Sequence, residues 1–248
     1  MIRILACAVS GLLTLASLPA SAHVSYSGRN LGTYADVGGS MTISNQTVSS
    51  NFGWADGLDA DFGDSHRLRA FRFTLTEATT VTFTAEAYAA ATPVSLGGLL
   101  PGFSIYSGLA HIAPFQADHD GAAATVAYLA SLPGVPKEGA FRAMNDWQMT
   151  NDAGDPFSVF TYMGSAFDAD LNGMASGSFT LAAGDYSVFV GGVNYVAQIG
   201  AMAPYPNYGL RVTLDVAAVP APVPEPETWA MLLAGLGLVG WAARRRQA

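Results

Sequence analysis

Apolar and polar residues alternate along several short segments of the chain. The alternation is unbroken from Leu210 to Val216, and residues 71–75 and 81–85 repeat the same period of two. This period places alternate side chains on opposite faces of a β-strand, so that one face packs into a core and the other meets water. In the longest of these strands, the residues expected to point inward are Leu210, Val212, Leu214 and Val216. Those expected to face water are Arg211, Thr213 and Asp215.

Turn residues separate further segments that are rich in Thr, β-branched and aromatic residues, as strands are. Ala183–Asp185 lies between the segments 179–181 and 186–190, which predicts a β-hairpin at this point. Further strands are expected at Val24–Tyr34, Met41–Val48, Phe103–Tyr106 and Phe157–Met163. About nine strands without alternating helices predict a mainly β fold, an antiparallel β-sandwich or jelly roll that spans residues 23–216.

One segment departs from the period of two. Asp120 precedes an Ala-rich run that ends before a Pro-Gly pair, and together these give the N-cap and stop signals of a helix. One short inserted helix is therefore expected within residues 120–132. The following residues, 134–156, contain Trp147 and many polar residues and are interpreted as a long surface loop.

The N-terminus has the three parts of a secretory signal peptide. A basic residue, Arg3, precedes an apolar stretch from Ile4 to Leu18, and Ala20 and Ala22 form a small-x-small cleavage site. We expect residues 1–22 to be a signal helix that the Sec export machinery recognises and that signal peptidase removes after Ala22.

The C-terminus combines a Pro-rich linker, a short apolar segment and a run of arginines. The linker, residues 217–228, is expected to be extended and solvated. The apolar segment, residues 229–243, would form a helix of about 22 Å, short of a hydrocarbon core of about 30 Å. Because Trp229 and Trp241 frame this segment at interfacial positions, we interpret it as a transmembrane helix. The basic tail, residues 244–248, is expected to stay on the cytoplasmic side.

A Pro-Glu-Pro motif, a short span rich in Leu and Gly, and the terminal arginines together resemble the PEP-CTERM sorting signal. The residues that carry this resemblance are Pro224, Glu225, Pro226, Arg244, Arg245 and Arg246. The resemblance covers roughly residues 223–247, about a tenth of the chain. It implies export, transient anchoring in the inner membrane, and removal of the tail by the membrane protease exosortase. It further implies an association with the envelope surface or with an exopolysaccharide or biofilm matrix.

Three strand segments carry a second resemblance, which concerns the ectodomain. Residues 102–108, 179–192 and 207–216 resemble the β-sandwich ectodomains that precede PEP-CTERM tails. They also resemble the pre-peptidase C-terminal jelly rolls of secreted bacterial enzymes, which are accessory or binding modules. This resemblance implies a binding domain rather than a catalyst.

The composition excludes several classes of protein. The formal net charge is −8, with 11 Lys and Arg against 19 Asp and Glu, whereas a nucleic-acid-binding protein needs a basic surface. Apolar residues make up 50% of the chain, which excludes an intrinsically disordered protein. The single cysteine, Cys7, lies in the predicted signal peptide, so the mature chain is expected to have neither a catalytic thiol nor a disulfide.

Residues 168–173 have the D-x-D-x-N-G spacing of a calcium-binding loop. Asp168, Asp170 and Asn172 would supply oxygen ligands, and the glycine would permit the sharp turn. The twelfth position is Phe179 instead of the usual bidentate glutamate, so a calcium site here would lie between strands and differ from an EF-hand. The alternative is an acidic turn, because Asp, Asn and Gly are also the residues that turns prefer.

Four carboxylates within nine positions form a second candidate metal site. They are Asp56, Asp59, Asp61 and Asp64. These charges repel one another unless water or a cation separates them, and calcium is again the natural cation for oxygen ligands. A solvated loop is the alternative. A third fragment, Asp118–Asp120, has the Asp-His-Asp pattern of a transition-metal site, but its last residue is better explained as a helix N-cap.

No G-x-S-x-G, H-E-x-x-H or phosphate-binding glycine motif is present in the sequence. The favoured hypothesis is therefore a non-catalytic protein of the envelope or matrix. One alternative is a carbohydrate-binding or adhesive module with calcium-stabilised loops and aromatic residues that stack on sugars. These aromatic residues are Trp54, Trp147, Tyr195, Tyr205 and Tyr208, for which burial as loop anchors is the competing explanation. A second alternative is a hydrolase with an unrecognised Asp-based site.

Overall fold

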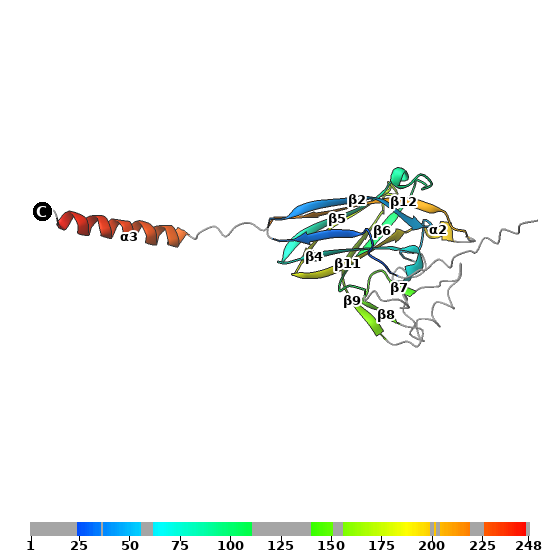
Figure 1. Cartoon of the computed structure of the whole chain (residues 1–248), viewed down its shortest axis with the longest axis horizontal. Coiled ribbons are helices and arrows are strands. Elements are labelled where there is room, and N and C mark those ends of the chain that lie inside the picture. Colours follow the sequence, from blue (N-terminus) through cyan, green and yellow to red (C-terminus); the bar gives the residue numbers. More distant parts are fainter. Residues whose placement is uncertain are drawn as a thin grey trace, which may run out of the picture.

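The structure is a computed structural model. It describes residues 24–35, 37–55, 62–110, 140–150, 156–198, 201, 204–218 and 226–246. Within them the chain is mainly β, and its strands form a six-stranded, a four-stranded and a two-stranded sheet (Figure 1). The two larger sheets contribute side chains to one shared core. The predicted antiparallel β-sandwich is therefore confirmed.

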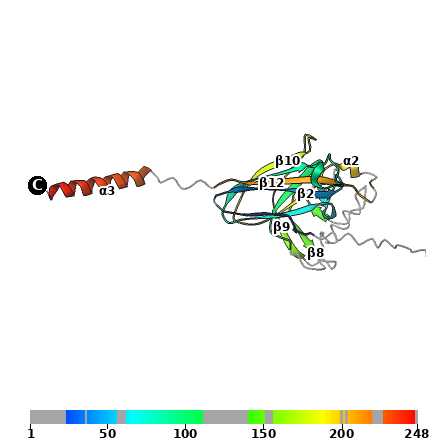
Figure 2. The same cartoon turned by 45° about the horizontal axis from the view of Figure 1, so that its top comes forward.

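The strands are divided between the two large sheets that form the layers of the sandwich (Figure 2). The six-stranded sheet contains, in order, β1 (Asn30–Tyr34), β4 (Arg69–Leu75), β11 (Gly184–Gly192), β6 (Pro101–Ser107), β9 (Pro156–Phe167) and β8 (Trp147–Thr150). The four-stranded sheet contains β10 (Met174–Leu181), β5 (Thr79–Ala87), β12 (Asn207–Val216) and β2 (Gly39–Ser49). The third sheet pairs β3 (Phe62–Asp64) with β7 (Ala140–Arg142). The described helices are η1 (Ser65–Arg67), η2 (Ala89–Ala91), α2 (Tyr195–Gln198) and α3 (Pro226–Arg245).

The faces of β12 are those that the alternation predicts. Its apolar side chains lie in the core between the sheets, while its polar side chains are half-exposed or exposed on the outer face. Across the core, the ring of Phe83 on β5 meets that of Phe103 on β6, with 4.7 Å between the ring centroids. The period of two thus sets which side of each strand contacts the opposite sheet.

The strand expected over Val24–Tyr34 begins only at Asn30. A turn precedes it, closed by a 2.9 Å hydrogen bond that the Arg29 backbone N–H donates to the Tyr26 carbonyl. The other predicted strands are present.

The hairpin predicted around Ala183–Asp185 is wrong. β10 pairs with β5, whereas β11 pairs with β4 and β6, so this turn carries the chain from one sheet to the other. Alternation shows that each segment buries one face, but it does not specify which strand lies alongside. Here the two segments contribute apolar side chains to the same core from opposite layers.

The outer face of the six-stranded sheet is covered by a second core. Phe189 of β11 and Phe160 of β9 lie in it, together with Phe141 of β7 and Trp147 of β8. The prediction of a surface loop over residues 134–156 is therefore wrong for its described part. Polar residues there alternate with aromatic ones that pack onto the sheet, and the aromatic residues decide the placement.

Several predicted segments fall outside the described residues. These are the signal helix at 1–22, the inserted helix at 120–132, and residues 219–225 of the linker. The apolar segment 229–243 forms most of α3, which Figure 1 shows apart from the sandwich. Among the helices that the structure describes, none combines the length and apolar character needed to cross a membrane.

Candidate functional site

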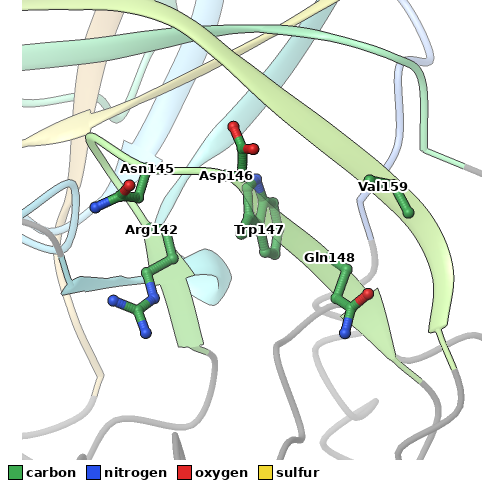
Figure 3. Close-up of a pocket in the computed structure, with 6 residues that line it drawn as sticks. All are labelled: Arg142, Asn145, Asp146, Trp147, Gln148 and Val159. Atoms are coloured by element: carbon green, nitrogen blue, oxygen red, sulfur yellow. The ribbon is translucent and has the colours of Figure 1, made fainter.

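A surface cleft of about 460 Å³ lies at the edge of the six-stranded sheet (Figure 3). Its lining residues are Arg142, Asn145, Asp146, Trp147, Gln148 and Val159. They come from the end of β7, the turn that follows it, β8 and β9. Among the described residues, the lining thus combines one cation, one carboxylate, two amides, an indole and an aliphatic side chain. Its volume lies within the range of about 300–1,000 Å³ that is typical of small-molecule sites.

The register of β8 and β9 separates the cleft from the second core. Trp147 lies opposite Phe160, and Gln148 lies opposite Val159. Because side chains on a strand alternate between faces, the first pair points into the second core and the second pair away from it. Val159 is 64% exposed and Gln148 is half-exposed, as expected for this outward face.

Hydrogen bonds to the six-stranded sheet fix the backbone of the cleft. The Tyr106 hydroxyl donates to the Arg142 carbonyl, and the Ser104 hydroxyl donates to the Ala143 carbonyl at 2.5 Å. At the start of β8, the Asp146 carboxylate accepts the Tyr162 backbone N–H at 2.7 Å. The cleft is therefore built on residues held at both ends of the turn, which favours a preformed shape.

Trp147 forms part of the cleft wall but is only 4% exposed. Its ring stacks on Phe160, with 4.9 Å between the centroids, and contacts the ring of Phe189 edge-on. Its indole Nε1 is buried and has no hydrogen-bond partner among the described residues. Leaving a buried donor unpaired costs free energy. Among the described residues that line the cleft, this N–H is the one buried polar group without a hydrogen-bond partner.

The predicted sugar-stacking aromatic residues are mostly occupied within the fold. Trp54 is buried and donates its indole N–H to the Ser104 hydroxyl at 2.9 Å. Tyr205 lies under the Arg67 guanidinium, with 3.7 Å from its ring centroid to Cζ. Tyr195 of α2 and Tyr208 of β12 are half-exposed. For Trp54 and Trp147, the burial explanation applies.

Asp168 closes the turn between β9 and β10. It is 2% exposed, and its two carboxylate oxygens accept the backbone N–H groups of Asn172 at 3.0 Å and Gly173 at 2.7 Å. The Asn172 amide oxygen in turn accepts the Met174 N–H at 3.0 Å. Gly173 has a φ of +84°, which explains why glycine occupies this position. Two of the three predicted calcium ligands thus serve as acceptors for the turn itself, and Asp170 is exposed.

Asp64 is the one member of the second acidic group that lies within the described residues. It is buried at the end of β3, where its Oδ2 lies 3.2 Å from Arg67 Nε and its Oδ1 accepts the His66 backbone N–H at 3.0 Å. Asp56, Asp59 and Asp61 lie outside the described residues, as does Asp118–Asp120. Within the part of the chain that the structure describes, no three His, Cys, Asp or Glu side chains are grouped to hold a metal ion.

The calcium hypothesis for residues 168–173 stays a prediction, and one melting experiment separates it from a structural role. We expect Asp168→Asn to cost about 1–3 kcal/mol of unfolding free energy, because an amide NH₂ replaces one of two acceptors. The loss should be the same in EDTA and in millimolar calcium. Asp170→Asn is the matched control and should stay within about 0.5 kcal/mol. A calcium-dependent rise of the wild-type midpoint that Asp168→Asn abolishes would instead support the cation.

Two solved structures are similar to this chain at low sequence identity. One is CorA, a surface-associated copper-binding protein of Methylomicrobium album BG8, with 16% identity and a TM-score of 0.45 over 75% of this chain and 98% of CorA. The other is mercury-soaked MopE, a secreted copper-binding protein of Methylococcus capsulatus, with 15% identity and a TM-score of 0.39 over 75% of this chain and 87% of MopE. Both TM-scores are below 0.5, so neither likeness carries an argument about the ligand of this chain.

The sequence comparisons concern the C-terminus. No curated protein matches the chain. The family model of the PEP-CTERM protein-sorting motif matches residues 222–246, which confirms the resemblance seen in the sequence. The chain therefore carries a PEP-CTERM sorting motif and is an exported protein that exosortase sorts.

Proposed function

We propose that the protein is a non-catalytic component of the cell envelope surface or of an extracellular, polysaccharide-rich matrix. The sorting motif at residues 222–246 carries this proposal, because it directs the chain out of the cell and marks the tail for removal. The sandwich supports it, since the last strand that contributes to its core, β12, ends at Val216, before the linker begins at residue 217. Removal of the tail would leave that core unchanged.

Fractionation of a native host tests the location. We expect the mature protein in the envelope-surface fraction or the matrix fraction, and we expect it to shift to the membrane fraction in a strain that lacks exosortase. Accumulation of mature protein in the periplasm of the wild-type strain would contradict the proposal. A hydrolase would be revealed by turnover in a screen on polysaccharides that is lost when loop aspartates are replaced.

Maturation gives a direct prediction about mass. The mature protein should begin at His23 and lack the segment from about Trp229 onward, because signal peptidase and exosortase each remove one end. Intact-mass measurement of protein from an exosortase-positive host checks both ends. A variant with Pro224, Glu225 and Pro226 replaced by alanine should retain the tail. Extracellular wild-type protein that still carries Arg244–Arg246 would argue against exosortase processing.

A further inference from the structure

We propose that β10 is a dimerisation edge, along which a second copy of this chain adds its own β10 in antiparallel orientation. A twofold axis at Gly177 would relate the two copies, and their four-stranded sheets would join into one continuous sheet. The inference goes beyond the proposed envelope or matrix function and does not depend on it, because it uses a strand of the sandwich and not the sorting tail.

β10 is the most regular of the edge strands, and it follows one margin of the sandwich (Figure 2). The other edge strands of the two large sheets are β1, β8 and β2. Each of these pairs with its neighbour through a register shift, whereas β10 pairs with β5 over all 8 of its residues without one. Irregular pairing, proline and charged residues protect an edge strand from other strands. The sequence of β10, MASGSFTL, contains neither proline nor a charged residue.

The free edge of β10 is formed by the backbone of every second residue. Just before the strand begins, the Ala87 N–H donates to the Gly173 carbonyl at 2.8 Å. Because hydrogen bonding alternates along an antiparallel pair, the odd-numbered residues of β10 bond to β5 and the even-numbered residues face the free edge. The Met174 N–H is already donated to Asn172 Oδ1. In the described part of the chain no strand pairs with β10 on that side, and the exposed residues whose N–H groups face it are Ser176, Ser178 and Thr180.

The sequence around Gly177 is symmetric, which favours a second copy as the partner. With Gly177 opposite the partner subunit's Gly177, Ser176 lies opposite the partner subunit's Ser178, and the reverse pair follows from the twofold axis. Each of these two pairs exchanges two backbone hydrogen bonds, and the Thr180 N–H of each copy reaches the Met174 carbonyl of the other. This register gives about six backbone hydrogen bonds between the copies.

The side chains of β10 also suit a second copy. Hydroxyls on the outer face already pair between β5 and β10, and these pairs include Thr82 with Ser178 at 2.7 Å and Thr84 with Ser176 at 2.9 Å. In the proposed register the serine hydroxyls of the two copies face each other, so the row of paired hydroxyls continues across the junction. On the inner face, Phe179 is half-buried, and the partner strand would cover more of its apolar surface.

The distribution of charge restricts where two copies can meet. The formal net charge of the chain is −8, so copies repel each other wherever their acidic surfaces face. β10 carries no charge, and neither does the neighbouring part of β9, residues 161–167. Phe179 of β10 lies against Gly164 of this part of β9, so both segments belong to the same side of the sandwich. This uncharged side is where association is least opposed.

Sedimentation velocity of the purified, exported protein at several concentrations tests the proposal. We expect a monomer–dimer equilibrium whose dissociation constant Ser178→Pro raises at least about tenfold, because proline removes an N–H that faces the free edge. The hydrogen bonds to β5 involve odd-numbered residues and should remain. Ser178→Lys keeps the backbone N–H and places a charge on the edge, so it should weaken the dimer as well. Circular dichroism verifies that each variant is folded.

Ser44→Lys is the matched control for the lysine variant. Ser44 is an exposed residue of β2, at the opposite edge of the same four-stranded sheet. The variant gains the same charge on an edge strand, but outside the proposed junction. Its dissociation constant should equal that of the wild type.

Cross-linking tests the register. The chain has one cysteine, Cys7, which lies in the predicted signal peptide, so introduced cysteines are expected to be alone in the mature protein. Ser176 and the partner subunit's Ser178 would have Cα atoms about 5.5 Å apart, which is within the range of a disulfide. The double variant Ser176→Cys, Ser178→Cys should therefore form a covalent dimer under mild oxidation. Each single variant should do so much more slowly, because its cysteine faces a serine.

Several results would overturn the inference. They are a monomer at every concentration, a dimer that both Ser178 variants leave unchanged, and an equal loss of the dimer in Ser178→Lys and Ser44→Lys. Cross-linking of the single variants as fast as the double variant would rule out the twofold axis at Gly177. Fractionation reports separately on the proposed function, so a monomer that reaches the envelope or matrix would disprove the dimerisation edge alone.

Discussion

Val212→Asp is expected to lower the free energy of unfolding by about 3–5 kcal/mol, because it places an unpaired charge in the sandwich core. Val212 is fully buried on β12, between Ala85 of β5 and Ile43 of β2. These neighbours offer the carboxylate no polar side chain. Urea denaturation of the exported protein, followed by circular dichroism, measures the loss.

The adjacent residue provides the matched control. Thr213 faces outward, where its hydroxyl shares a 2.9 Å hydrogen bond with that of Thr42 on β2. Thr213→Asp loses this exposed contact and adds a charge near Asp215 in the same strand, so the expected cost is at most about 1 kcal/mol. Equal losses in the two variants would mean that the faces of β12 are assigned incorrectly.

Strands with one buried face could be predicted from the sequence. β12 and β5 belong to the four-stranded sheet, whose outer face bears hydroxyls such as those of Thr84 and Ser176, paired across strands at 2.9 Å. Because that face is exposed to water, every second residue is polar, and this produces the period of two. The presence of β5 and β12, and the residues that they bury, can therefore be predicted from the sequence alone.

The six-stranded sheet is harder to predict, because its central strands are buried on both faces. β11 is buried over nearly its whole length, with Val188 facing the first core and Phe189 facing the second. A strand with two buried faces has no obligatory alternation. The residues of β11 therefore do not indicate what covers the outer face, and the polar residues of β7 and β8 favour the interpretation as a surface loop.

The same reason explains why the cleft was missed. Asn145, Asp146 and Gln148 surround Trp147 in the sequence, and such a mixture is typical of an exposed loop. Only the pairing of β8 with β9 places the indole of Trp147 in the second core and the amide of Gln148 on the opposite face. The available signal was this alternation of aromatic and polar residues, which is too short to stand out without its partner strand.

The acidic motifs illustrate a different limit of prediction. The spacing of Asp168 and Asn172 predicts side-chain oxygen atoms that gather at a turn. In the structure, these oxygen atoms accept hydrogen bonds from backbone N–H groups of that turn. Carboxylates accept hydrogen bonds from amides and bind cations with the same lone pairs, so spacing alone does not distinguish the two.

Arg67→Met is expected to cost about 3–5 kcal/mol of unfolding free energy, because it leaves the charge of Asp64 buried without its partner. Arg67 and Asp64 are 7% and 4% exposed, and 3.2 Å separates the guanidinium Nε from Oδ2. The substitution also removes the cation–π contact with Tyr205, where Cζ lies 3.7 Å from the ring centroid. Met retains most of the buried aliphatic length, so lost packing contributes little.

A double-mutant cycle shows whether the buried charge causes this loss. Asp64→Asn removes that charge, so the variant carrying both substitutions should be less destabilised than the sum of the single variants, by about 1–3 kcal/mol. The half-exposed pair of Arg211 and Glu86 is the control, since its side chains are 40% and 29% exposed. Arg211→Met should cost at most about 1 kcal/mol, because solvent screens that pair. Additive losses at positions 64 and 67, or equal losses for Arg67→Met and Arg211→Met, would show that the buried charge of Asp64 does not cause the loss.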